Sequence, residues 1–427
     1  MKYNKISNKL FIKNRKDFIT ELASNSIAFF NSNDIYPISA DSTLPFEQHR
    51  DIFYLSGIDQ EESILVISNN KNYDYKEILF IRETNDHIIH WEGEKLTKKE
   101  ATEVSGINTV HWLGEFDRFL DELIKNHDNI YINTNEHYRQ NVETETREDR
   151  FIKKLKKIGG INFKKSNPIL QKQRSIKDPI EIELIKKACE ITKKGFERVL
   201  SFVKPGVWEY EIEAEFSHEF LRNKSKRFAY TPIIASGINS NYLHYIKNNK
   251  QCQSGEIILM DVGAEYANYS SDMTRTIPVN GKFTTRQKTI YQAVLNVKKS
   301  ATELLRPGIL WKDYHIEVGN IMTSELLKIG LLNKVDIQNQ TKKKPAYKKY
   351  FSHGTSHHMG LDTHDYCDLD IPFEKNMVLT VEPGIYIMEE GFGIRLEDDV
   401  VINENGSPTN LMANIPIEIE EIEGLMN

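Results

Sequence analysis

Four acidic residues and one histidine in the C-terminal half of the chain are candidate metal ligands. They are Asp261, Asp272, His357, Glu382 and Glu397. Three of the carboxylates end short apolar stretches, which we expect to be strands over residues 257–261, 377–382 and 393–397. A buried, ionised carboxylate costs several kcal/mol unless a cation or hydrogen bonds compensate it. We therefore expect these carboxylates to converge around shared cations.

The type and spacing of these residues favour a centre with two metal ions. Asp261 and Asp272 are eleven residues apart, and a hairpin of that length can bring both to one end of a sheet. Oxygen donors with one imidazole suit Mn²⁺, Mg²⁺ or Co²⁺. Four carboxylates are too many for one ion but suit two ions that share oxygens. Two such ions can bind one hydroxide between them and stabilise a tetrahedral intermediate.

Histidines form the second group of candidates. Four lie within twelve residues: His353, His357, His358 and His364. An imidazole beside a metal centre can hydrogen-bond a substrate carbonyl or move a proton without binding the metal. His244 is a further candidate, although a loop histidine is as often structural. Arg395 precedes Glu397 by two residues on a predicted strand, so both are expected to face one side and interact.

Composition describes an ordinary soluble protein. With 427 residues, the chain is long enough for two domains. Its net charge of −6 argues against nucleic-acid binding, and we expect the basic run 342–349 to be a solvated loop. Three widely spaced cysteines favour a reducing compartment. No segment has the apolar length of a signal peptide or membrane span, so we expect a cytoplasmic location and no membrane partner.

The order of predicted elements indicates an α/β protein of two domains. Strand patterns in the first third alternate with helical ones such as 116–126, and they cover 26–30, 63–67, 77–81 and 129–133. A polar, basic stretch from about 144 to 177 follows, and we place the domain boundary near residue 170. The expected domains are therefore 1–170 and 171–427.

The second domain contains a weak internal repeat. Its first helix is predicted to start at Asp178, which can cap it, with Pro179 in the first turn and Glu181 three residues on. That helix ends at Lys-Pro-Gly (204–206), and Arg-Pro-Gly (306–308) follows another long helix. Each is followed by a further helix and a strand-rich segment. Two similar halves with a site between them are expected, although so short a match can also arise by chance.

The candidate ligands and their flanks resemble the pita-bread metallopeptidases, the creatinase and methionine aminopeptidase family, whose ligands come in the order Asp, Asp, His, Glu, Glu. The order is matched in Met-Asp-Val-Gly (260–263), Ser-Asp-Met-Thr-Arg (271–275), His-Gly-Thr-Ser-His (353–357), Val-Glu-Pro-Gly-Ile-Tyr (381–386) and Arg-Leu-Glu-Asp-Asp (395–399). The resemblance is greatest to the aminopeptidase P group, since the segment Pro-Phe-Glu-Gln-His-Arg-Asp-Ile-Phe-Tyr-Leu-Ser-Gly (45–57) is similar to that group's first domain. It spans nearly the whole chain and implies an N-terminal creatinase-like α/β domain before a pita-bread domain with duplicated halves.

The resemblance also implies a role for each ligand. Asp272 and Glu397 would bridge two ions, and Asp261 would complete one site. His357 and Glu382 would complete the other, and Glu382 would also accept or relay the proton of the attacking hydroxide. His358 departs from the pattern, since some relatives carry an aromatic or apolar residue there. The framing Ser-His-x-x-Gly (356–360) favours His357 as the ligand.

The remaining polar residues would handle the substrate. The resemblance implies that His364 and His244 steady the substrate carbonyl and the geometry of the scissile proline bond. His353 would line the pocket for the proline ring. Arg395 would orient Glu397 or meet the peptide beyond the proline.

The implied activity is that of a dimetal exopeptidase that releases the N-terminal residue from peptides with proline in the second position. Prolidase is the alternative, since it shares all five ligands but cleaves only dipeptides. Creatinase and non-catalytic pita-bread binding proteins are further alternatives that do not need, or have lost, the ligands kept here. Two divalent ions are implied, Mn²⁺ first, with Co²⁺, Zn²⁺ and Fe²⁺ also suited to these donors. Relatives form dimers or tetramers, and Trp91 could line a neighbour's site.

Overall fold

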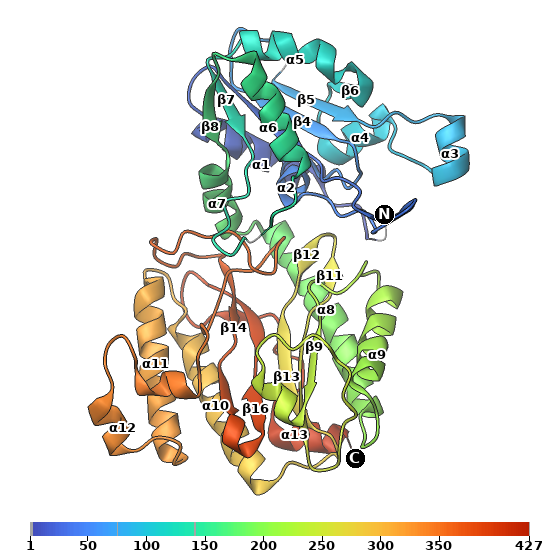
Figure 1. Cartoon of the computed structure of the whole chain (residues 1–427). Helices are drawn as coiled ribbons and strands as arrows, with labels where there is room; N and C mark the ends of the chain where they lie inside the picture. The colour runs from blue at the N-terminus through green and yellow to red at the C-terminus, as the bar shows by residue number, and fades with distance from the viewer. Residues whose placement is uncertain (1–2, 75, 141, 427) are drawn as a thin grey trace. The chain divides into compact units, whose positions relative to one another are not determined.

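The computed structural model describes residues 3–74, 76–140 and 142–426 and contains two compact units, Tyr3–Gln173 and Arg174 to the C-terminal end (Figure 1). The unit boundary falls within α7 (Asn167–Ser175). Each unit has its own sheets and helices. Among the described residues, no helix has the length and apolarity needed to cross a membrane.

The first unit is a six-stranded mixed sheet between two layers of helices. The sheet order is β6-β5-β4-β1-β7-β8, with bounds Ser26–Asn31 (β1), Ile64–Ser68 (β4), Glu77–Ile81 (β5), Val110–Trp112 (β6), Asn129–Ile132 (β7) and Asn162–Lys165 (β8). The helices are α1 (Asn8–Glu21), α2 (Arg50–Ser56), α3 (Asp86–Glu92), α4 (Lys98–Ser105), α5 (Phe116–Lys125) and α6 (Arg147–Ile158). A small hairpin, Pro37–Ser39 (β2) with Ser42–Thr43 (β3), completes it.

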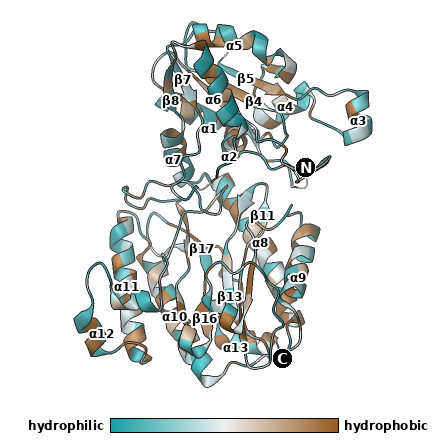
Figure 2. Cartoon of the chain, viewed as in Figure 1, coloured by the Kyte–Doolittle hydropathy of each residue, from teal (hydrophilic) through white to brown (hydrophobic). Residues whose placement is uncertain are grey.

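Alternating side chains of the buried strands pack on opposite faces of this sheet. On β1, Phe29 contacts Phe116 of α5 and Phe151 of α6, and Phe30 contacts Phe18 of α1. Every residue of β1 is buried, as expected for a strand covered on both sides. The predicted strands and helix 116–126 are thus present, and the polar stretch after 144 forms α6, β8 and α7. The strands are largely apolar, and polar residues are spread over the helices (Figure 2).

The second unit has two halves with the same order of elements. The first contains α8 (Pro179–Phe202), α9 (Glu209–Arg222) and the antiparallel sheet β13-β10-β9, formed by Met273–Pro278, Ile257–Val262 and Ile233–Ser236. The second contains α10 (Thr285–Leu304), α11 (Trp311–Lys328) and the antiparallel sheet β14-β17-β18, formed by Val378–Val381, Asp398–Val401 and Thr409–Asn410. Smaller elements are the hairpins Glu265–Tyr266 (β11) with Tyr269–Ser270 (β12) and Gly384–Ile387 (β15) with Phe392–Arg395 (β16), and the helices α12 (Lys334–Asn339) and α13 (Ile419–Leu425).

The two Pro-Gly turns confirm the predicted repeat at the level of backbone contacts. Gly206 and Gly308 both adopt positive φ, +97° and +89°, a conformation that costs glycine little. The amide of Gly206 donates to the carbonyl of Cys252, and that of Gly308 donates to the carbonyl of Phe373, each at 2.9 Å. The following residues, Val207 and Ile309, accept from Cys252 and Phe373, each at 2.8 Å. Matching contacts in both halves make a chance repeat untenable.

The start of α8 follows from its sequence. The side chain of Asp178 accepts from the amide of Ile180, and the side chain of Glu181 accepts from the amide of Asp178. This capping box satisfies two amides that the first helical turn leaves unpaired. The helix then packs along α9 and against the hairpin of β11 and β12, which lies between the first two candidate ligands in the chain.

Candidate metal centre

The first half of the second unit supplies Asp261 and Asp272 from adjacent strands. Asp261 lies on β10, opposite Thr274 of β13, and Asp272 immediately precedes β13. The small hairpin β11–β12 makes the turn between them. The expectation that a hairpin brings both carboxylates to one end of a sheet is confirmed. The hydroxyl of Tyr230 lies 2.6 Å from Asp261 Oδ1 and 2.5 Å from Asp272 Oδ1.

The second half supplies the other three residues. His357 lies beside β14, where the amide of Thr380 donates to its carbonyl at 3.0 Å. Glu382 directly follows β14, and Glu397 lies in the short link between β16 and β17. The amide of Glu397 donates to the carbonyl of Thr274 at 3.1 Å, which joins the two halves at this point.

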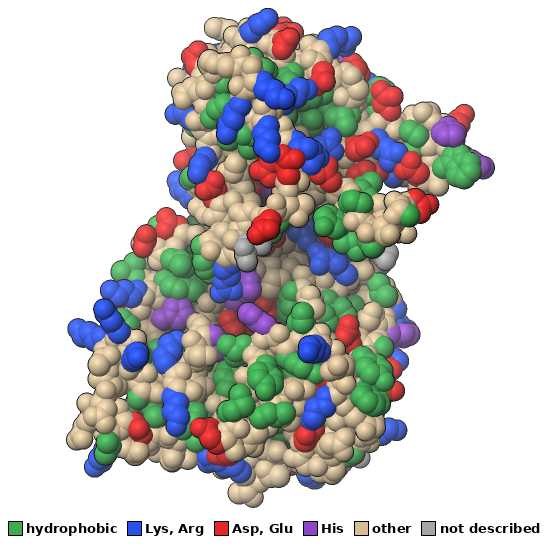
Figure 3. Space-filling view, viewed as in Figure 1, with side chains coloured by type: hydrophobic (Ala, Val, Ile, Leu, Met, Phe, Trp, Pro, Cys, Tyr) green, Lys and Arg blue, Asp and Glu red, His purple; other side chains and the backbone are tan. Residues whose placement is uncertain are grey.

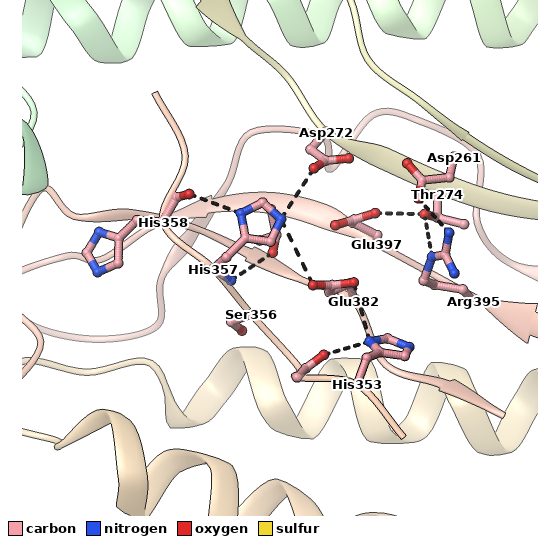
Figure 4. A network of polar contacts seen from close by, with 12 residues as sticks. Asp261, Asp272, Thr274, His353, Ser356, His357, His358, Glu382, Arg395 and Glu397 are labelled. Carbon is pink, nitrogen blue, oxygen red and sulfur yellow. Dashed lines mark hydrogen bonds and ion pairs between the residues drawn. The ribbon is translucent and has the colours of Figure 1, made fainter. Parts of the chain in front are cut away.

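All five side chains face a common space (Figure 4). Asp272, His357 and Glu397 are buried and each offer one ligand atom, and these atoms lie within 4.8 Å of one another. Glu382 Oε1 is 4.0 Å from His357 Nε2, and Asp261 is joined to Asp272 through Tyr230. Histidines and carboxylates also lie close together on this unit in the space-filling view (Figure 3).

One predicted strand is shorter than expected. We expected a strand through residue 397, but β16 ends at Arg395, so Glu397 is not a strand neighbour of Arg395. The backbone turns there because β17 begins at Asp398 and pairs with β14. Arg395 Nη2 contacts Asp261 Oδ2 at 2.5 Å instead. Thr274 connects Arg395 to Glu397, since its hydroxyl accepts from Arg395 Nε at 3.1 Å and donates to Glu397 Oε2 at 2.7 Å.

The hydrogen bond made by one ring nitrogen of His357 leaves the other nitrogen facing a carboxylate. Its Nδ1 lies 3.0 Å from the carbonyl oxygen of His358, which can only accept, so Nδ1 carries the proton. In the neutral ring, Nε2 then presents a lone pair toward Asp272 Oδ2 at 3.4 Å. Two acceptors then face each other, and either a proton on Nε2 or a bound cation would relieve their repulsion. Histidine ligands of metals are typically held by this kind of Nδ1 contact, so the donor set fits divalent ions.

The electrostatics of the site show the same need for positive charge. Burial raises the pKa of Asp261 despite the nearby Arg395 guanidinium, and raises the pKa of Glu397 well above its ordinary value. Burial raises the pKa of Glu382 to about 7. Burial opposes protonation of His357, but its hydrogen bond to Asp272 and the charge of Glu382 raise its pKa to about 9. Cations bound among these carboxylates would remove the penalty.

The other predicted histidines differ in their burial and in their contacts with this cluster. His353 Nδ1 lies 3.5 Å from Glu382 Oε2, and its Nε2 lies 2.8 Å from the Tyr386 hydroxyl. The exposed ring of His364 stands edge-on to the ring of His357, with centroids 4.4 Å apart. His244 is exposed and lines a cavity of about 620 Å³. Its charge contributes to lowering the pKa of His353, which burial mainly depresses to about 3.

His358 faces away from the cluster (Figure 4). Its ring stacks on Trp311, with centroids 5.8 Å apart and an interplanar angle of 22°. Burial lowers its pKa to about 3, so it is neutral. Of the two adjacent imidazoles, only His357 is directed at the carboxylates.

Three residues that contact the candidate ligands or the residues beside them were not predicted from the sequence. Tyr230 contacts Asp261 and Asp272. Thr274 contacts Glu397. Tyr386 contacts His353 and Arg395. Thr274 and Tyr386 lie inside the matched ligand segments but are not ligand types. Tyr230 is far from them in sequence. A pairing of β10 with β13 would have drawn attention to Thr274, which is opposite Asp261.

Comparison with protein families gives two matches. Residues 183–404 match the model of metallopeptidase family M24, and residues 11–131 match the model of the aminopeptidase P N-terminal domain. The first match contains all five candidate ligands. Together the two matches cover both units of the structure.

Known proteins resemble the chain over its full length. It is 34% identical to the Xaa-Pro aminopeptidase of Escherichia coli K12, over 99% of this chain and 98% of that protein. It is 31% identical to human Xaa-Pro aminopeptidase 3, over 92% of this chain and 79% of that protein. Among solved structures, E. coli aminopeptidase P with the inhibitor Pro-Leu matches with a TM-score of 0.89 and 32% identity, over 99% of each chain. The zinc-substituted E. coli enzyme with product matches with a TM-score of 0.89 and 33% identity over the same shares.

Proposed function

The chain belongs to metallopeptidase family M24, and on this premise we propose that it is an Xaa-Pro aminopeptidase, which releases the N-terminal residue from peptides with proline in the second position. The observation that carries the proposal is the buried cluster in which Nε2 of His357 faces the carboxylates of Asp272 and Glu382. Prolidase is not favoured, because relatives matched at full length are named Xaa-Pro aminopeptidases.

We propose that two divalent ions, most suitably Mn²⁺, are the cofactors. Asp272 and Glu397 would bridge them, Asp261 would complete one site, and His357 with Glu382 would complete the other. When bound, such ions acidify a water molecule and polarise the scissile carbonyl. The zinc-substituted relative is consistent with a site of this kind that accepts more than one metal.

The protein's own residues would then position the peptide and move protons. Glu382 is proposed to accept the proton of the attacking water, since it borders both His357 and His353. His364 and His244 would hydrogen-bond the substrate carbonyl. His353 would border the proline ring, held by the Tyr386 hydroxyl at 2.8 Å.

For Arg395 we propose the first of the two expected roles, the orientation of Glu397, together with a direct contact to Asp261. Its guanidinium contacts Asp261, the Thr274 hydroxyl and the Tyr386 hydroxyl, so all three of its nitrogens face the site. We propose that it fixes Asp261 directly and Glu397 through Thr274. It would thereby offset part of the negative charge when no peptide is present.

The oligomeric state is a further proposal. We propose a homodimer or homotetramer, because α3 has no buried side chain and Trp91 on it is 73% exposed. Light scattering of the purified protein tests this, and a monomer at micromolar concentration would contradict it. The cytoplasmic location, the absence of nucleic-acid partners and the domain boundary near residue 170 stay predictions.

The substrate assignment is tested with matched peptides. The protein is stripped of metal, reloaded with Mn²⁺ and given Xaa-Pro-Yaa, Xaa-Ala-Yaa and Xaa-Pro. We expect release of Xaa from the first peptide only, because the tertiary amide of proline requires a dedicated pocket. Cleavage of the dipeptide alone would identify a prolidase, and no cleavage with any divalent metal would contradict the proposal.

A further inference from the structure

A buried ionic cluster lies outside the metal centre, in the same unit. Asp365 is 3% exposed and Arg174 and Lys177 are 2% and 1% exposed. Arg174 Nη2 lies 2.6 Å from Asp365 Oδ1, and Lys177 Nζ lies 3.0 Å from Asp365 Oδ2. The amide of Tyr366 donates to Asp365 Oδ1 at 2.8 Å. The Asp365 carboxylate is therefore held by two cations and a backbone amide, and Arg174 Nη2 also lies 2.6 Å from Asp362 Oδ2.

The cluster anchors the end of an irregular loop that starts at the metal centre. Between His358 and Asp365 the described chain has no helix and no strand. The amide of Asp365 donates to the carbonyl of His358 at 2.9 Å and closes the loop. A Cβ at Gly360 would lie 2.2 Å from Asp365 Oδ2 and 2.9 Å from Lys177 Cε. The loop thus packs tightly against the ionic cluster and depends on glycine there.

The loop carries His364 directly before the anchored residue. Asp365 is buried, but His364 is exposed, and its ring lies beside His357 with centroids 4.4 Å apart. His364 lies in no helix or strand, so the contacts of the loop on either side of it help to set its backbone position. Asp365 makes the fully buried charged contacts of this loop, and Asp362 also pairs with Arg174. Although burial favours the neutral acid, Arg174 and Lys177 keep the pKa of Asp365 below its ordinary value, and the anchor stays ionised at neutral pH.

We propose that Arg174 and Lys177 are positioning residues for the reaction, which hold His364 over the metal centre by pairing with Asp365. The inference rests on the proposed function for the role of His364, but the coupling between Arg174 and His364 is a separate property of the protein. A purely structural cluster would stabilise the fold equally whether or not His364 is present. A positioning cluster would matter for turnover only through His364.

Arg174→Lys is the principal test, because lysine keeps the charge but lacks the longer, planar guanidinium whose Nη2 reaches both Asp362 and Asp365. We expect kcat to fall about 10- to 100-fold, as for a displaced catalytic group, and KM to change little. Metal content should stay at the wild-type level. The control is Asp362→Asn, which removes the other carboxylate partner of Arg174, one whose side chain is 45% exposed. We expect a smaller loss of kcat than in Arg174→Lys, because the Asp362 carboxylate is partly solvated and its pair with Arg174 contributes less than the fully buried pair with Asp365.

A double-mutant cycle separates positioning from stability. In a His364→Ala background, Arg174→Lys should lower kcat by less than about threefold, since residues acting as one unit are not additive. An equal loss in both backgrounds would overturn the proposal. If Arg174→Lys does not fold, Lys177→Gln, which removes only one of the two cations, is used in the same cycle with the same expectations.

A measurement without catalysis keeps the inference distinct from the proposed function. In metal-free protein labelled with ¹³C-histidine, the Cε1–H resonance of His364 is assigned by its loss in His364→Ala. We expect Arg174→Lys to shift or broaden this resonance and leave that of His127, in the other unit, unchanged. An unaltered His364 resonance would refute the coupling even if wild-type peptidase activity is found. A wild type without activity would refute the proposed function alone.

Discussion

Thr274→Val tests whether the link between Arg395 and Glu397 controls metal affinity. Valine has nearly the shape of threonine, and Thr274 is fully buried, so the substitution removes little except the hydroxyl. Glu397 Oε2 loses its donor at 2.7 Å, and Arg395 Nε loses its acceptor at 3.1 Å. A hydrogen bond to a charged group is worth about 1.5–3 kcal/mol. Every 1.4 kcal/mol is about tenfold in affinity, so one such bond predicts a loss of about 10- to 100-fold in metal binding.

The assay is titration of metal-free protein with Mn²⁺ by calorimetry, with metal content checked by plasma spectrometry. Thr276→Val is the matched control, since Thr276 lies two residues along β13 and its hydroxyl contacts only the backbone of Arg395. It should bind metal with nearly wild-type affinity. Metal affinity within twofold of wild type in Thr274→Val, or an equal loss in Thr276→Val, would refute the reasoning.

Three more perturbations have definite expected outcomes. Asp272→Asn should lose at least one metal ion and nearly all turnover, and wild-type turnover in that variant would contradict the proposed bridging role. His358→Ala should keep metal and turnover but lower the melting temperature, because truncating a buried ring leaves a cavity beside Trp311; loss of metal would contradict its placement. Burial raises the pKa of Glu148 from 4.5 to about 7, so the folded state binds the proton more tightly and stability falls as pH rises from 4.5 to 7. Between pH 5 and pH 8, the free energy of unfolding of Glu148→Gln, measured by denaturation, should rise by up to about 3 kcal/mol relative to that of the wild type. A difference independent of pH would contradict the raised pKa of Glu148.

Much of the fold was predictable because local rules and tertiary packing agree. The helix start at Asp178 was read from its capping residues and is present. The Pro-Gly turns ended two long helices as expected. The end of β16 was missed because Gly-Ile-Arg-Leu-Glu (393–397) alternates as a strand would, and only the pairing of β17 with β14 ends it at Arg395.

The candidate site was predictable in its ligand types but not in its connections. Carboxylates at the ends of apolar runs are visible in a sequence, since their burial is costly. The contact of Arg174 with Asp365 joins residues 191 positions apart and has no local pattern. The same holds for the Tyr230 hydroxyl, which lies 31 positions from Asp261 and 42 from Asp272. Such contacts arise only when separate elements have packed.

The division of the ligands between the two halves of the second unit affects how this protein comes apart. Asp261 and Asp272 belong to one half, and His357, Glu382 and Glu397 to the other, so neither half owns a complete set. Divalent ions bound to these residues would link the two halves. Removal of the ions by a chelator would leave mutually repelling carboxylates between the two halves. On warming, the halves would then separate first where β13 meets the link that carries Glu397.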